Sequence, residues 1–191
     1  MKLSTSYLSK VCLLAAISFV LMLIEFAVPF FPSFLKIDAS DLPALIGSMA
    51  MGPLAGVLIE LVKNLLHLLR TSTGGVGEMA NFLVGSAFVL PVGIISKKSK
   101  NLKGYLMGVS LGAIFMTAAA CICNYYILIP LYSAFMPLEA ILEMAKTANS
   151  AVVDLKTLII FAVAPFNLLK AFLVSLIGYR LFRLIIRLIR T

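Results

Sequence analysis

The sequence contains few charged residues, and this scarcity excludes a soluble domain. Charged residues make up only 13% of the 191 positions, whereas hydrophobic residues make up 62% and the mean hydropathy is +1.09. A soluble protein of this length would lack the polar side chains needed to cover its surface. An integral membrane protein fits instead, and at about 20 residues per spanning helix the chain accommodates about five to seven spans. We therefore expect a single transmembrane domain over 1–191, with no room for a separate soluble domain.

The sequence also lacks the motifs of several enzyme classes. It has no GxxxxGK[ST] nucleotide-binding loop, no HExxH motif and no CxxC pair. The three cysteines, Cys12, Cys121 and Cys123, favour packing over metal or redox roles, because no second histidine or paired cysteine accompanies them. We therefore expect no metal site, no bound cofactor and no ATP-hydrolysing machinery within this chain.

Acidic residues are half as numerous as basic ones, with 8 against 16 and a net charge of +8. In a membrane protein this excess reflects cytoplasmic loops rather than nucleic-acid binding. With six helical segments and both termini in the cytoplasm, ten basic residues fall on the cytoplasmic side: Lys2, Lys10, Lys97, Lys98, Lys100, Lys103, Arg180, Arg183, Arg187 and Arg190. The sequence thus predicts an all-α, six-helix transmembrane bundle with cytoplasmic N and C termini.

Glycine, proline and charged residues between the apolar runs indicate where helices end. The first helix is expected over 6–29 and is too long for a cleaved signal peptide. Others are expected over 41–51, 53–69, 78–96 and 104–134, with a short interfacial helix over about 138–147. The GxxxG units at Gly104, Gly108 and Gly112 predict close helix contact. The last helix begins near 154 with a kink at Pro165, or begins near 165.

Two polar residues interrupt the final apolar run. Asn167 and Lys170 are three positions apart, so they share one helical face. A lysine within a bilayer costs roughly 3 kcal/mol on insertion scales, and it is tolerated where it faces a bundle interior, a wet cavity or a ligand. An amide and an ammonium group at one place predict a buried site for a polar, planar small molecule.

Other polar residues lie on the expected helices. Glu60, Lys63, Asn64 and His67 share a face of the third helix. This face indicates either a wall of a ligand site or ion path, or a structural ion pair beside an interface histidine. Glu78 opens the fourth helix near Asn81, where it either caps the helix or contacts ligand. Asn124 lies in the fifth helix beside two tyrosines and requires a hydrogen-bonding partner.

Several separated motifs together resemble one family. They are LKIDASDLPAL over 35–45, GPLAG over 52–56, KNLLH over 63–67, GEMANF over 77–82 and PFNLLK over 165–170. In order and spacing they are similar to the riboflavin-specific substrate-binding (S) subunits of energy-coupling factor (ECF) transporters, the RibU family. The resemblance covers nearly the whole chain. It implies a non-enzymatic six-helix subunit of a prokaryotic plasma membrane that captures riboflavin from outside.

The resemblance also implies partners and site residues. One transmembrane coupling subunit and two cytoplasmic ATPases would drive release of riboflavin, the transported ligand, into the cell. The family's ligand positions correspond to Asn124, Asn167 and Lys170, with the first outer loop at Ile37, Asp38 and Ala39 closing the site. Further expected ligand-binding residues are Glu60, Lys63, Asn64, Glu78 and Asn81. The family's small-residue docking motif on the first helix corresponds to Cys12, Ala15 and Ala16.

Two other hypotheses remain open from the sequence. The same scaffold could carry another vitamin, such as thiamine or biotin. Alternatively, Glu60, Lys63 and His67 could serve a small membrane enzyme acting on a lipid-like substrate. Covalent turnover of a bound molecule would distinguish such an enzyme from a binding subunit, which returns its ligand unchanged.

Overall fold

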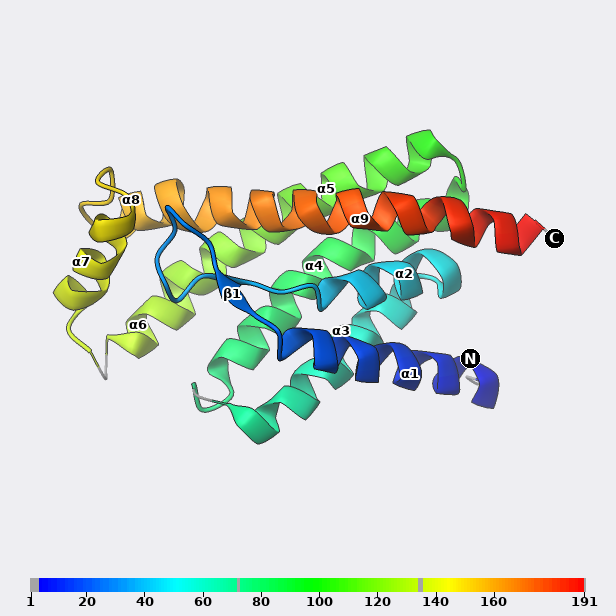
Figure 1. The fold of residues 1–191 in the computed structure, drawn as a ribbon, viewed down its shortest axis with the longest axis horizontal. Helices are drawn as coiled ribbons and strands as arrows, with labels where there is room; N and C mark the ends of the chain where they lie inside the picture. Colours follow the sequence, from blue (N-terminus) through cyan, green and yellow to red (C-terminus); the bar gives the residue numbers. More distant parts are fainter. Residues whose placement is uncertain (1–3, 72, 134–135, 191) are drawn as a thin grey trace.

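The computed structural model is an elongated bundle of helices (Figure 1). It describes residues 4–71, 73–133 and 136–190, with side chains described as far as Leu181. Lys2 and the side chains of Arg183, Arg187 and Arg190 therefore lie outside the described part. Four helical runs are long and apolar enough to cross a membrane: Thr5–Met22, Val76–Lys98, Leu102–Tyr132 and Leu155–Leu181.

The bundle helices follow the apolar segments of the sequence. Helix α1 covers Thr5–Met22, α2 Asp41–Met51, α3 Pro53–His67 with the 3₁₀ turn η1 at Leu68–Arg70, and α4 Val76–Lys98. Gly52 separates α2 from α3, and Pro53 stands at the first position of α3, where its missing N–H costs no helical hydrogen bond. The expected ends of the second helix and the start of the third are confirmed.

The expected end of the first helix near residue 29 is wrong. Helix α1 ends at Met22, and the chain then forms a two-stranded antiparallel hairpin of β1 (Phe26–Ala27) and β2 (Lys36–Ile37). Its register pairs Phe26 with Ile37 and Ala27 with Lys36. An ion pair between Glu25 and Lys36 adds to this pairing. The segment after Met22 is apolar enough to continue a helix, but its residues instead pair with β2, which follows β1 after eight residues.

Two of the bundle helices contain a π-helical turn. The first run consists of α5 (Leu102–Cys123), η2 (Asn124–Leu128) and α6 (Ile129–Tyr132). The second consists of α8 (Leu155–Leu158), η3 (Ile159–Val163) and α9 (Ala164–Arg190). The last helix therefore begins at Leu155, and η3 lies just before Pro165, where the missing proline N–H interrupts regular helical bonding.

The short helix α7 covers Leu138–Ala148, close to the interfacial helix expected there. Counting each uninterrupted run once, the described residues form seven helices, one more than the six expected for the bundle, because α7 is a separate helix. It buries Ile141 and Ala145 against the cluster formed by the hairpin end, α5 and η3. A second apolar cluster lies among α1, α2, α3, α4, α5 and α9.

The glycine spacing in α5 produces the close contact that it predicts. A Cβ added at Gly112 would lie 2.6 Å from the carbonyl oxygen of Phe88, and one at Gly108 would lie 3.2 Å from the Cα of Val92. Helices α4 and α5 therefore approach backbone to backbone. This contact fixes the wall of the bundle that carries Asn124.

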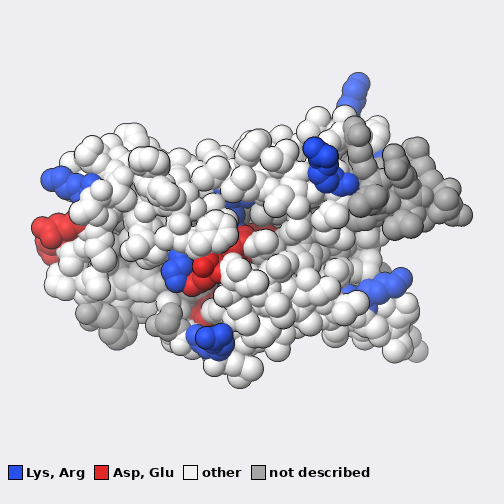
Figure 2. Space-filling view, viewed as in Figure 1, with Lys and Arg blue, Asp and Glu red and all other residues white. Residues whose placement is uncertain are grey.

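The two ends of the bundle differ in what they carry. The N and C termini and the α4–α5 connection lie at one end, whereas the hairpin and α7 lie toward the other (Figure 1). Figure 2 shows that most of this face is uncharged, with acidic and basic side chains gathered near its middle, over the region of the hairpin. The other charged side chains on this face lie toward its two ends.

Candidate functional site

A cavity of about 410 Å³ lies between the hairpin segment and helices α4, α5 and α9. It brings together six of the expected ligand residues: Asp38, Glu78, Asn81, Asn124, Asn167 and Lys170. Its other lining residues are Met22, Glu25, Phe34, Leu35, Lys36, His67, Thr73, Gly77, Ala80, Val84, Ala120, Leu128, Tyr132 and Phe166. Its size falls within the roughly 300–1,000 Å³ typical of small-molecule sites.

Two asparagines face the cavity, each beside a π-helical turn. Asn124 is the first residue of η2, and Asn167 follows η3 by one helical turn. Their amide nitrogens donate to backbone oxygens four residues earlier, Asn124 to Ala120 at 2.8 Å and Asn167 to Val163 at 2.9 Å. Each amide thus keeps its carbonyl oxygen and one N–H for a molecule in the cavity. Single π turns occur frequently at functional sites.

Lys170 is held by two carboxylates. Its Nζ lies 3.2 Å from Oδ2 of Asp38, in the segment after β2, and 3.1 Å from Oδ2 of Asp41, at the start of α2. The lysine is 6% exposed, so both pairs are largely shielded from water. An ammonium group has three donors. Lys170 donates a hydrogen bond to Asp38 and forms an ion pair with Asp41, which leaves an N–H for a molecule in the cavity.

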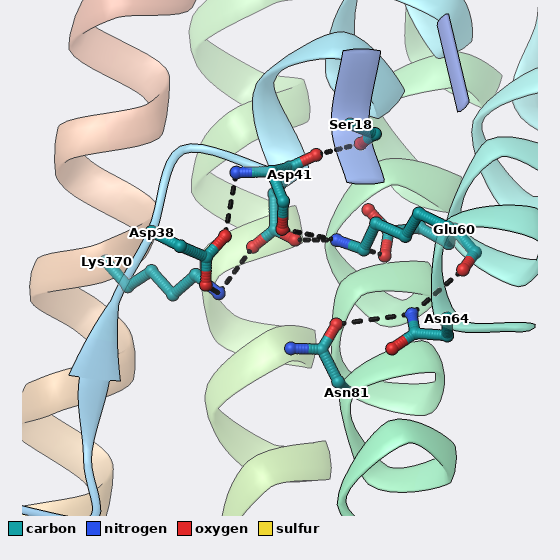
Figure 3. Close-up of polar contacts among 9 residues, drawn as sticks. Ser18, Asp38, Asp41, Glu60, Asn64, Asn81 and Lys170 are labelled. Atoms are coloured by element: carbon teal, nitrogen blue, oxygen red, sulfur yellow. Dashed lines mark hydrogen bonds and ion pairs between the residues drawn. The ribbon is translucent and has the colours of Figure 1, made fainter. Parts of the chain in front are cut away.

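A second buried lysine, Lys63, lies outside the cavity lining and next to the partners of Lys170. Lys63 Nζ contacts Asp41 Oδ1 at 2.5 Å, Ser40 Oγ at 2.9 Å and Glu60 Oε2 at 2.8 Å. Lys63 and Glu60 are fully buried and Asp41 is 1% exposed. Asp41 therefore bridges the two lysines, one oxygen to each (Figure 3). This ion network joins α2, α3 and α9.

Comparison with known proteins assigns this chain to a family. The family model for the substrate-specific component of ECF transporters matches residues 6–182. The chain belongs to this family.

Two relatives of this S component are named as riboflavin transporters. This chain is 36% identical over 176 residues to "Riboflavin transporter RibU" of Staphylococcus aureus (strain TCH60), covering 92% of this chain and 88% of that protein. It is 37% identical over 170 residues to "Riboflavin transporter FmnP" of Bacillus subtilis (strain 168), covering 87% and 85%. A solved structure described as "Structure and mechanism of the S component of a bacterial ECF transporter" matches with a TM-score of 0.76 at 32% identity, covering 97% of this chain and 98% of that chain.

On the polar face of α3 in this S component, His67 lines the cavity, whereas Glu60, Lys63 and Asn64 lie next to it. The expected i,i+3 pair of Glu60 and Lys63 is confirmed, at 2.8 Å. Asn64 donates to Asn81 Oδ1 at 3.3 Å, and Asn81 lines the cavity. The three α3 residues expected to bind ligand thus contact residues that line the cavity, directly or through Asp41.

Glu78 closes the end of the cavity near the η1–α4 connection. Its Oε1 lies 2.9 Å from His67 Nδ1, and its Oε2 accepts from the hydroxyls of Thr71 and Thr73 at 3.0 Å each. Both oxygens are engaged by the protein itself. This tie between α3 and α4 fixes the wall on which Gly77 and Asn81 stand.

Ser40 and Asp41, at the start of α2, use their side chains in the ion network. Ser40 occupies the N-cap position of α2, but its side chain makes no capping hydrogen bond. Instead its hydroxyl accepts from Lys63, and its backbone oxygen accepts from the Ser18 hydroxyl of α1. Asp41 is the counterion that both lysines share. Two lysines in apolar helices require buried counterions, so the pairing could have been sought among the few acidic residues.

The expected residues of the first outer loop differ in where their side chains lie, in the cavity lining or in the apolar core. Asp38 lines the cavity, whereas Ile37 is 6% exposed and packs in the apolar cluster of the hairpin end. Ala39 is half-buried and accepts a hydrogen bond from the backbone of Leu42. Sequence reasoning did not single out Glu25, Lys36, Thr73 or the aromatic wall of Phe34, Phe166 and Tyr132. Their signal is weak, because isolated polar or aromatic residues near helix ends are common.

The three expected docking residues of α1 do not share a face. Cys12 and Ala16 are exposed, whereas Ala15 is fully buried against the other helices. Ala15 therefore packs the bundle interior and is unavailable to an outside partner. Among the described residues no group of three or more histidine, cysteine or acidic side chains is arranged to hold a metal ion.

Proposed function

We propose that this chain captures riboflavin from outside the cell as the substrate-specificity subunit of an ECF transporter. One observation carries the proposal: the buried side chains of Asn124, Asn167 and Lys170 converge on one cavity in a chain of the S-component family. The riboflavin transporters named above, each more than 30% identical over most of both chains, support this choice of ligand. These relatives are transport proteins, so a binding subunit that returns its ligand unchanged replaces the enzyme hypothesis.

The hydrogen-bonding groups suit an isoalloxazine ring. Its pyrimidinedione edge alternates acceptor, donor and acceptor. A free carbonyl oxygen of Asn124 or Asn167 can accept from the single ring N–H, and the remaining amide N–H groups and a free donor of Lys170 can serve the two ring carbonyls. Phe34, Phe166 and Val84 supply apolar surface for the flat ring. A positively charged vitamin such as thiamine would instead meet the Lys170 ammonium.

Copurified flavin and a binding titration test this function. Purified wild-type protein should carry flavin visible as a yellow colour, and the stripped protein should quench riboflavin fluorescence on rebinding. Thiamine and biotin serve as competitors in the same titration. Displacement of riboflavin by either competitor at equal concentration, or absence of riboflavin binding, would contradict the assignment.

The ends of the bundle support an orientation. The termini and the α4–α5 connection, with Lys97, Lys98, Lys100 and Lys103, share one end, and this basic end is assigned to the cytoplasm (Figure 1). The cavity then opens toward the outside. Single cysteines at the exposed positions Ser33 and Lys100, in a cysteine-free background, report the topology through an impermeant thiol reagent on intact cells. Labelling at position 100 but not at 33 would reverse the orientation.

The energy source lies in other subunits. The family implies an energy-coupling module, for which we propose one transmembrane coupling subunit and two cytoplasmic ATPases. The exposed small residues Cys12 and Ala16 of α1 are the proposed docking surface. Ala16→Trp should abolish uptake by the full complex and leave riboflavin binding intact, whereas the outward-facing Leu13→Trp serves as the matched control. Concentrative uptake by the lone subunit in proteoliposomes would refute the coupling model.

A further inference from the structure

Lys63 lies outside the cavity, and the function proposed above gives it no role. Lys63 is absent from the cavity lining, yet it is fully buried, donates to Ser40 and Asp41 and forms an ion pair with Glu60. Retaining an ammonium group in such a place is unfavourable unless its partners hold it firmly. The route that consists of charged groups alone runs from Lys63 to Asp41 and from Asp41 to Lys170 (Figure 3). Lys63 is also linked to Asp38 of the lining through Ser40, whose hydroxyl accepts from Lys63 and whose backbone N–H donates to Asp38.

We propose that Lys63 is a positioning residue for ligand capture: through Asp41 it fixes the direction in which Lys170 presents its remaining donor. This inference rests on the proposed function, since Lys170 is the residue that would meet the flavin. Lys63 itself contacts no ligand.

The geometry of Asp41 supports this route. Its Oδ1 is bound to Lys63 at 2.5 Å and its Oδ2 lies 3.1 Å from Lys170, so the carboxylate plane is fixed by both. Without Lys63, Oδ1 would have no ammonium partner and Asp41 could rotate toward Lys170. Lys170 would then have two carboxylate oxygens of Asp41 to contact besides Asp38. Its ammonium would turn from the cavity toward the network.

The charges of the network favour the same outcome. Three carboxyl groups, on Asp38, Asp41 and Glu60, face two ammonium groups, on Lys63 and Lys170. Removal of Lys63 would leave Lys170 as the remaining cation of this set. Attraction between unlike charges is strong in such a poorly hydrated place, so Lys170 would be drawn toward the carboxylates and away from the ligand.

A double-mutant cycle on the full chain tests the proposal. Riboflavin affinity is measured for wild type, Lys63→Met, Lys170→Met and the double variant. Lys63→Met should weaken binding by about fivefold or more in the wild-type background, in line with coupling energies within one polar network. It should cause no further loss in the Lys170→Met background. Lys63→Arg, which keeps the charge, should restore most of the affinity.

Two further measurements separate positioning from folding. Asp41→Asn keeps the side-chain shape and leaves both lysines in place, so it carries the test if Lys63→Met fails to fold; it should also lose affinity only when Lys170 is present. The absorption band of bound flavin responds to hydrogen bonds at its carbonyl groups. Lys63→Met and Lys170→Met should shift that band in the same direction, whereas Lys156→Met, at an exposed lysine outside the network, should leave it unchanged.

The outcomes distinguish the two proposals. If the wild type does not bind riboflavin, the proposed function fails. If the wild type binds and Lys170→Met weakens binding, but Lys63→Met retains full affinity or its loss persists without Lys170, the positioning role is overturned. In that case Lys63 contributes only to folding.

Discussion

Replacement of Lys170 by methionine is the most informative perturbation of the site. Methionine preserves much of the length of the side chain and removes the ammonium. Asp38 and Asp41 would then lose a shared cation at a place where their own exposed fractions are 8% and 1%. Two effects follow, one on ligand binding and one on folding, and they differ in size.

The binding effect comes from one lost donor. Removing a hydrogen-bond partner from a buried acceptor costs about 1–3 kcal/mol, which corresponds to roughly 5-fold to 150-fold weaker riboflavin binding. The folding effect is larger, because removing one member of a buried ion pair costs about 3–5 kcal/mol. Lys63 still neutralises one oxygen of Asp41 at 2.5 Å, so the lower part of that range applies.

Fluorescence quenching and thermal unfolding in detergent measure the two effects separately. The matched control is Lys156→Met, an exposed lysine on the same helical run, which should change neither quantity. Lys170→Met combined with Asp38→Asn should recover part of the lost stability, because one unpaired carboxylate is removed, while affinity remains low. Wild-type affinity in Lys170→Met would refute the reasoning, since it would show that the ammonium does not meet the ligand.

Three further predictions concern separate parts of the molecule. Asn124→Ala and Asn167→Ala should each weaken riboflavin binding by about 1–3 kcal/mol in the same titration, and unchanged affinity in both would exclude the amides from the site. Gly112→Leu should lower the unfolding temperature in detergent, because its side chain would meet the backbone of Phe88, whereas Ser110→Ala in the same helix serves as the control. Hydrogen bonds from the backbone N–H and hydroxyl of Thr157 lower the pKa of Asp154. The stabilising effect of the Asp154 carboxylate is therefore present at neutral pH and is lost as the pH falls through that lowered pKa. The melting curves of Asp154→Ala and wild type should differ at pH 7 and converge in acid.

The apolar periods and helix breakers of the sequence determined much of the secondary structure. The short helix over 41–51, the start of α3 at Pro53 and the interfacial helix near 138–147 follow from local signals that act within a few residues. A proline directly after a glycine favours a helix start, and so does a charged residue before an apolar run. Both signals act on the local backbone, whatever tertiary structure surrounds it. The choice of Asn167 and Lys170 as site residues likewise needed only the cost of polar groups in an apolar helix.

Tertiary structure decided the features that depend on distant partners. Helix α1 ends at Met22, and the following residues pair with Lys36–Ile37 in a hairpin that the apolar sequence after Met22 did not predict. Ala15 faces inward and Ala16 outward, which the near-uniform hydrophobicity of α1 could not distinguish. Apolar residues suit both a lipid-facing and a buried surface, so in a membrane helix hydrophobicity alone does not mark the inner face.

The ion network shows the same division most clearly. The sequence identified Lys63 and Lys170 as buried cations and paired Lys63 with Glu60, because an i,i+3 contact is fixed by the helix itself. It did not identify Asp41 as the shared counterion, since Asp41 is 129 positions from Lys170 along the chain. Only the packing of α2 between α3 and α9 brings the three charges together. The sequence shows which buried lysines need a counterion, whereas the fold decides which acidic residue supplies it.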